Sequence, residues 1–274
     1  MFKNLRTSTK LLLLCAVFVG ALAVATYSLV AEKQIAIQFV RKELVGVAHL
    51  EALRDVYAAI LTEATGPSPV TAKASLDRLA KAGTADTHQL NTAALQRALA
   101  DSVDRLAASA GREERGALLV EALTAARNLA SRIGDDSNLT LDPDLDSYYV
   151  QDIATSKMPV LLSQIGEQYS GLAMSSSPRP APDSLAVRTL VLDGLIRSTL
   201  ERIDRDLKAS YRGAGGAELR RVLGDDAKAM AATWNDYLEA AKANLAGVSD
   251  AGAFDRIETT PQCAAGKPAW QVAE

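Results

Sequence analysis

The feature that most restricts how this chain can fold is a run of twenty residues without a charged side chain, residues 11–30. At about 1.5 Å per residue, a helix of this length crosses a hydrocarbon layer of about 30 Å. Lys3, Arg6 and Lys10 precede the run, and by the positive-inside rule they keep the N-terminus in the cytoplasm. We therefore expect a cytoplasmic N-terminus (residues 1–10), a transmembrane helix (residues 11–30) and an extracytoplasmic remainder.

The same run has a second interpretation, as a cleaved signal peptide. Residues 21–25 contain two overlapping triplets, Ala-Leu-Ala and Ala-Val-Ala, that offer small residues at the spacing of a cleavage site. A membrane anchor is favoured because the apolar run continues past both triplets to Val30 and helical periodicity follows directly. Both interpretations export the rest of the chain.

Beyond this run the sequence is patterned for helices. Apolar residues recur at steps of three and four, clusters of β-branched residues are scarce, and only 5% of the residues are aromatic, which favours helix over strand. With 48% apolar residues in a chain of 274, there is enough apolar surface for a sizeable core. We predict an all-α protein, with an N-terminal transmembrane helix followed by an elongated antiparallel helical bundle or by two stacked four-helix modules.

The interruptions of the pattern predict the helix boundaries. Prolines and glycines break it at residues 66–69, at Gly83, at residues 175–183 and at residues 213–216. Pro159 instead falls within a helical segment, which it should kink or locally unwind.

The predicted extracytoplasmic domain covers residues 31–247. We expect six principal helices in it, with the first and the last long and antiparallel, so that both ends of the domain lie near the membrane. The helical pattern collapses after Gly247. Residues 248–274 are therefore expected to form an irregular tail.

A joint between two helices lies near the middle of the chain, in residues 137–152. Asp is a favoured N-cap and Pro is favoured at the first helical position, so Asp142 and Pro143 are predicted to restart a helix. Asp146 would lie in its first turn, where exposed amides favour negative charge. Asn138 tolerates the left-handed conformation that tight turns often need. We therefore assign Asp142, Pro143 and Asp146 a structural role in the joint.

The joint also carries a family resemblance. Residues 138–149 read Asn-Leu-Thr-Leu-Asp-Pro-Asp-Leu-Asp-Ser-Tyr-Tyr, and Met-Pro follows at residues 158–159. This run resembles the extracytoplasmic helical sensor regions of bacterial transmembrane receptors, which include methyl-accepting chemotaxis proteins, sensor histidine kinases and membrane-bound diguanylate cyclases. Glu43 and the Gly-Val pair at residues 46–47 are similar to the same group.

The resemblance implies a ligand-sensing input region in signal transduction, of the chemotaxis or two-component type. It would be a single-pass protein of the cell inner membrane with its bundle in the periplasm, and we expect a homodimer. Such receptors continue into a second membrane span and a cytoplasmic output module. Residues 259–268 can neither cross a bilayer nor form a stable helix, so we expect both parts to be lacking.

Two other interpretations stay open. One is a membrane-anchored extracytoplasmic helical scaffold protein without a small-molecule ligand. The other is an exported binding protein released by signal cleavage.

Four residues are the candidate ligand contacts: Arg54, Asn138, Tyr148 and Tyr149. Arg54 adjoins the apolar stripe of the first long helix. If its guanidinium points inward, it can bind a carboxylate or an oxyanion through two parallel hydrogen bonds. The alternative is a solvated arginine that only stabilises its helix. The other three would contact a ligand if the joint lines a slot between helices.

No pattern points to catalysis, to a cofactor or to a metal. His49 and His88 lack the paired spacing of a zinc site, and Cys15 and Cys263 form no Cys-x-x-Cys pair. The alternating aspartates of the joint lack the glycine and the glutamate of a calcium loop. We therefore expect no enzyme activity. The net charge of −3, with both signs interspersed, argues against nucleic acid and leaves the membrane and an unidentified small molecule as the expected partners.

Overall fold

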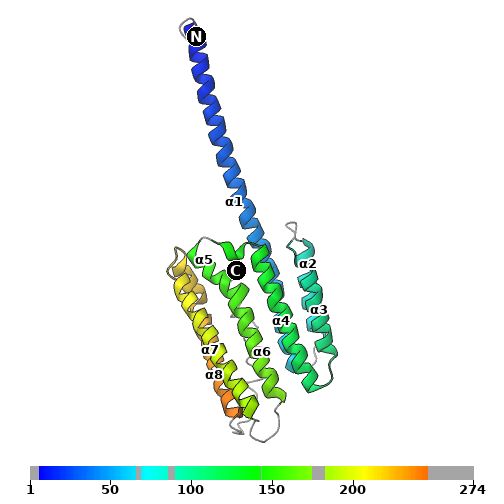
Figure 1. Ribbon diagram of the computed structural model, residues 1–274. Coiled ribbons are helices and arrows are strands. Elements are labelled where there is room, and N and C mark those ends of the chain that lie inside the picture. Colours follow the sequence, from blue (N-terminus) through cyan, green and yellow to red (C-terminus); the bar gives the residue numbers. More distant parts are fainter. Residues whose placement is uncertain (1–5, 66–68, 86–89, 143, 175–182, 246–274) are drawn as a thin grey trace. The chain divides into compact units, whose positions relative to one another are not determined.

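The computed structural model describes residues 6–65, 69–85, 90–142, 144–174 and 183–245. Every regular element in these ranges is helical (Figure 1), which confirms the predicted all-α class. The elements are α1 (Thr7–Thr65), α2 (Pro69–Ala85), α3 (Ala93–Ala108), α4 (Arg112–Asp136), the 3-10 turn η2 (Leu139–Leu141), α5 (Leu145–Asp152), the π-helical turn η3 (Ile153–Lys157), α6 (Met158–Met174), α7 (Asp183–Ser210) and α8 (Gly216–Leu245).

The chain divides into two units, Met1–Glu43 and Leu44–Glu274. The first unit contains most of α1. In this part of the helix the apolar side chains are exposed, and Leu12 and Phe18 are each 71% exposed. Among the described residues, α1 is the helix long and apolar enough to cross a membrane. Its length and composition therefore agree with the predicted anchor.

In the second unit the helices lie side by side. α4 and α6 pack together in the middle, with α2 and α3 on one side and α7 and α8 on the other (Figure 1). One continuous core connects the two sides, including Tyr57 from α1, Leu123 from α4, Ile165 from α6 and Trp234 from α8. The arrangement is a single bundle of antiparallel neighbours, and the alternative of two modules stacked end to end is not adopted.

The first and last helices of this bundle run parallel, so the expectation that they are antiparallel was wrong. Gly46 of α1 lies against Ser137 at the joint, and Gly215, just before α8, donates a hydrogen bond to Asp146 of α5. Both helices therefore lead away from the joint. The expectation of six principal helices left out one crossing of the bundle, because α2 is a full helix of 17 residues.

Gly83 does not end α2, which continues to Ala85. A Cβ at Gly83 would lie 2.9 Å from Nε2 of Gln96 on α3. The glycine thus leaves room for the Gln96 side chain, and the predicted break there was wrong.

Pro159 has the predicted effect. The five residues of η3 form a π-helical turn directly before α6. Because Pro159 lacks an amide hydrogen and its ring crowds the preceding turn, a widened turn at this place relieves both problems. The loop predicted at residues 175–183 lies outside the described residues except for Asp183, and so does the predicted tail.

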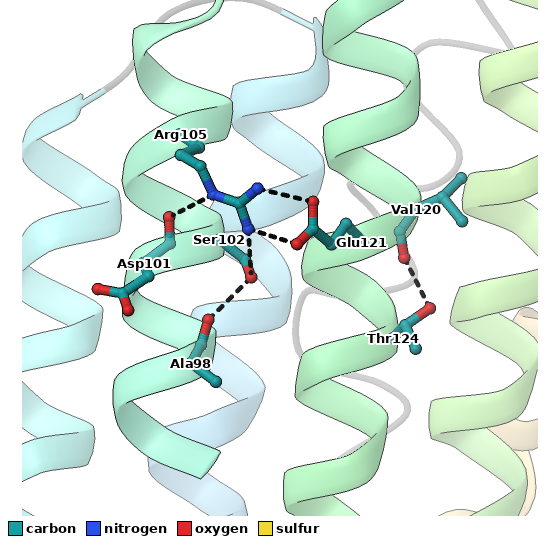
Figure 2. Close-up of polar contacts among 7 residues, drawn as sticks. All are labelled: Ala98, Asp101, Ser102, Arg105, Val120, Glu121 and Thr124. Atoms are coloured by element: carbon teal, nitrogen blue, oxygen red, sulfur yellow. Dashed lines mark hydrogen bonds and ion pairs between the residues drawn. The ribbon is translucent and has the colours of Figure 1, made fainter. Parts of the chain in front are cut away.

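Figure 2 shows how α3 and α4 are held in register. The guanidinium of Arg105 donates hydrogen bonds to both carboxylate oxygens of Glu121, with Nη1 lying 3.0 Å from Oε2. Its Nε also donates to the Asp101 carbonyl oxygen over 3.3 Å. Both charged side chains are about half exposed, so this pair fixes the relative position of the helices more than it adds stability.

Candidate functional site

The joint differs from its prediction in where the helix starts. Asn138 has a φ of 66°, which confirms the predicted left-handed conformation. The helix α5 begins at Leu145, with Asp144 at its N-cap position. The assignment of Asp142 as N-cap was therefore wrong, and Pro143 lies outside the described residues.

Asp142 stabilises the joint in another way. Its carboxylate accepts hydrogen bonds from the Asp144 amide and from the Gln151 side chain, each over 2.9 Å. A short aspartate side chain that binds the backbone two residues further on forms a turn by itself, which delays the start of the helix.

Asp146 connects the joint to the turn between α7 and α8. The Gly215 amide donates to its Oδ2 over 2.6 Å, and the Ser147 amide donates to its Oδ1 over 3.1 Å. These bonds, above all the one from Gly215, hold the pKa of Asp146 below its ordinary value. A Cβ at Gly213 would lie 3.0 Å from the Asp146 backbone nitrogen and closer still to its side chain. The two glycine- and aspartate-rich segments of the sequence thus meet in space.

A cavity of about 440 Å³ lies at the joint. Asp146 and Gln151 line it, together with apolar residues of α1, η2 and α8 that include Leu50, Leu139 and Leu219. The Gln151 side-chain oxygen is buried without a hydrogen-bond partner. This cavity carries carboxylates and an amide and no cation on its lining.

None of the four predicted ligand residues lines this cavity, a second cavity of about 350 Å³ between α2 and α3, or a third cavity between α7 and α8. Arg54 pairs with its neighbour Asp55 over 3.3 Å, and Asp55 also binds Arg78 of α2. Tyr148 and Tyr149 pack edge to face, with ring centroids 5.3 Å apart. The joint does contain a slot, but its walls come from the neighbours of the predicted residues.

A buried ion cluster that the sequence did not predict lies beside η3. Lys157 is 8% exposed, and its Nζ pairs with the carboxylates of Asp152 and Asp206. Burial lowers the pKa of Lys157, but the two carboxylates outweigh it and the net shift is upward. The cluster ties η3 to α7. The five-residue spacing from Asp152 to Lys157 suits a π turn, which the sequence could not reveal.

The largest of the three cavities lies between α7 and α8 and measures about 640 Å³. This volume falls within the range of small-molecule sites. Leu200, Ile203 and Leu207 of α7 line it together with Ala227 and Met230 of α8. Its wall is thus largely aliphatic.

Tyr211 and Arg220 lie on the lining of the same cavity. The guanidinium carbon of Arg220 lies 5.2 Å from the centre of the Tyr211 ring, a distance at which a cation is attracted to the ring face. The Tyr211 hydroxyl is buried and has no hydrogen-bond partner. A buried hydroxyl without a partner costs about 1–3 kcal/mol, so a ligand group that accepts its hydrogen bond would be favoured.

The sequence contained only a weak signal for this site. Arg220, Gly224 and Lys228 follow one another at steps of four on α8, so they share one face of the helix. The middle residue of the three is a glycine, which leaves space between the two cationic side chains. Residues 213–216 were predicted only to interrupt the helical pattern, and Tyr211 lies two residues before them.

The described residues contain no group of three or more His, Cys, Asp or Glu side chains that could hold a metal ion. Comparison with family models, with curated proteins and with solved structures finds no match to this chain. A functional proposal therefore rests on two features of the chain. These are the residues that line the cavities at the joint and between α7 and α8, and the resemblance of residues 138–149.

Proposed function

We propose that this chain is the ligand-sensing input region of a bacterial membrane receptor. In this proposal α1 anchors the protein in the inner membrane in a single pass, the N-terminus stays in the cytoplasm and the helical bundle lies in the periplasm. The resemblance of residues 138–149 to sensor regions supports it, and so does the apolar N-terminal helix that follows three cationic side chains.

The observation that carries the proposal is the cavity between α7 and α8. It joins an aliphatic wall to a buried hydroxyl without a partner. A protein that serves only as a scaffold gains nothing from such a hydroxyl, because the unmade hydrogen bond lowers its stability. A binding protein recovers that free energy when the ligand arrives.

A ligand screen on the full chain, held in amphipol, tests this function. A molecule that binds only the folded protein raises its midpoint of thermal unfolding in a concentration-dependent manner. We expect at least one class among small acids, amines, oxyanions and amphipathic molecules to do so. If no class stabilises a chain that unfolds cooperatively, the ligand-free scaffold is the better interpretation.

We also propose that two copies associate through α7. Val187, Leu190, Val191 and Leu195 are all exposed, at 60%, 56%, 58% and 48%. Their steps of three and four place them in one stripe on the helix, and a two-fold axis would pair this stripe with itself in the second copy.

Val191→Glu tests the dimer, with Val222→Glu on α8 as the matched control, since Val222 is also exposed. Sedimentation of the full chain in amphipol should show a dimer for the wild type and the control and a monomer for Val191→Glu. A Val191→Glu protein that stays dimeric would show that copies meet elsewhere.

A further inference from the structure

The cavity between α7 and α8 has an excess of positive charge on its lining. Lys208, Arg220, Arg221 and Lys228 face two carboxylates, those of Asp204 and Asp225. The cavity lining therefore favours an anion over a cation as its occupant.

Three of the four cations are already paired. Lys208 binds Asp204 over 2.6 Å, Lys228 binds Asp225 over 3.1 Å, and Arg221 pairs with Glu218. Within the part of the chain that the structure describes, no ion pair joins Arg220 to a carboxylate. Arg220 is thus the cation of this cavity that is available to an anionic ligand.

The contact between Arg220 and Tyr211 leaves the guanidinium able to bind an anion. Arg220 is placed over the ring, and the N–H groups of a guanidinium lie in its own plane, where they can bind both oxygens of a carboxylate. Tyr211 adds a second donor, because burial raises the pKa of its hydroxyl above the ordinary value of 10.0 and keeps it protonated at neutral pH.

The rest of the cavity suits an extended apolar chain. The lining covers residues 200–211 of α7 and its following turn and residues 220–231 of α8, or about 16 Å along each helix. Gly224 lies between Arg220 and Lys228 on α8, and a Cβ there would meet only Arg220 Cγ, at 3.8 Å. The missing side chain contributes to the space between the two helices.

We propose that the α7–α8 cavity binds an amphipathic carboxylate, with its headgroup on Arg220 and Tyr211 and its hydrocarbon chain along Leu200, Ile203, Leu207 and Met230. This inference rests on the proposed ligand-sensing function and names the class of ligand. The site uses the one uncommitted cation of the cavity and its one buried hydroxyl without a partner among the described residues that line it.

Four probes separate the contributions of head and tail: octanoate, octan-1-ol, octylammonium and acetate. Their binding to the full chain in amphipol is measured by calorimetric titration at low and at moderate salt. Octanoate should bind at least about tenfold more tightly than each of the others, since it alone offers both an anionic head and a chain. Equal binding of octanoate and octanol, or tighter binding of octylammonium, would overturn the proposal.

Three variants locate the site. Arg220→Gln should weaken octanoate binding about tenfold and leave octanol binding almost unchanged. Arg221→Gln is the matched control on the same helix, and its effect should stay below about threefold, because Arg221 is already paired with Glu218. Tyr211→Phe should weaken octanoate binding without lowering the midpoint of thermal unfolding, since it removes a hydroxyl that has no partner.

Filling the cavity provides a test that does not depend on charge. Gly224→Leu should abolish binding of octanoate and of octanol and leave the protein folded, because leucine favours helix more than glycine does. Ala232→Leu on the same helix, at an exposed position outside the cavity lining, is the control and should bind octanoate like the wild type. Octanoate binding that survives Gly224→Leu would place the ligand elsewhere.

The outcomes distinguish this inference from the proposed function. If octanoate does not bind but another class of molecule in the screen stabilises the protein, the receptor function stands and the assignment of the α7–α8 cavity is wrong. If no class of molecule stabilises the protein, the receptor function and the cavity assignment are both wrong.

Discussion

Asn138 shows how a single backbone angle determines a local structure. It is the non-glycine residue with a positive φ among the described residues. Alanine in the left-handed region costs about 1 kcal/mol, whereas glycine adopts it freely. Asn138→Ala should therefore lower the free energy of unfolding by about 1 kcal/mol and Asn138→Gly should change it little, as measured by urea denaturation. Equal stability of the two variants would contradict this assignment.

Asp146 should make the joint sensitive to acid. Its pKa in the folded protein is lowered from 3.8, so its contribution to stability is fully present above that ordinary value and is lost as the pH falls through the lowered folded value. We expect the midpoint of thermal unfolding of the wild type to drop below about pH 4 more steeply than that of Asp146→Asn.

The control for this pH dependence is Asp144→Asn, two residues away, whose side chain is exposed. It should follow the wild-type profile. A wild-type profile that coincides with that of Asp146→Asn between about pH 2 and pH 5 would mean that the bond from Gly215 contributes nothing to stability.

Individual residues could be predicted where the reason for them is local. The left-handed Asn138 follows from its own chemistry, and Asp146 in a first helical turn follows from the helix start. The partner of Asp146, the Gly215 amide, is 69 residues away, and no local pattern indicates it. Arg220 was missed for a similar reason, because its role depends on which of its neighbours are already paired.

At the scale of elements, the Lys157 cluster should contribute to stability by tying η3 to α7. Lys157→Met would leave the carboxylates of Asp152 and Asp206 close together without their cation. Removing one member of a buried ion pair costs about 3 kcal/mol, so this variant should unfold at a clearly lower urea concentration. Adding Asp206→Asn should restore part of the loss, because it removes the repulsion.

The same cluster predicts a second pH dependence, at the alkaline end. The pKa of Lys157 is raised above 10.5 in the folded protein, so its stabilising effect is fully present below that value and is lost as the pH rises through the higher folded value. Lys157→Met should lack this alkaline loss. The two unfolding profiles, recorded from pH 8 to about pH 12, should therefore converge as the pH rises.

Helices were predictable because the spacing of apolar residues that indicates a helix lies within each segment of the sequence. α1, α4, α7 and α8 all appear where apolar residues recur at steps of three and four. Glycines were harder to interpret, since the same residue can end a helix or let a neighbouring side chain approach. Gly83 does the second, and its partner Gln96 belongs to the next helix.

For the whole molecule, the proposed topology predicts where a fused reporter is active. A phosphatase fused after Leu245 should be active on the extracytoplasmic side, and the chain should remain in membranes after a high-salt wash. Changing Lys3, Arg6 and Lys10 together to Glu should reduce that activity strongly. Lys33→Glu, beyond the apolar run, is the control and should have little effect. A soluble product that begins near Ala25 or Thr26 would contradict the anchor.

The direction of the last helix was the main error at this scale. Each helix that crosses the bundle reverses the chain, so one additional crossing changes the orientation of everything after it. The pattern of α2 was visible in the sequence, but whether it forms a full crossing depends on its packing against α3 and on Asp55 of α1, which binds Arg78.

The widened turn of η3 has a consequence for the length of the chain. A π-helical turn holds one residue more than an α-helical turn between its hydrogen-bonded ends, so Ser156, which is exposed, can be deleted while α5 and α6 keep the faces that they bury. Deleting the equally exposed Ser198 in regular α7 would instead rotate all later residues by about 100° and move Ile203 and Leu207 out of the core. Insertions and deletions of a single residue in homologous chains should therefore collect between Ile153 and Lys157.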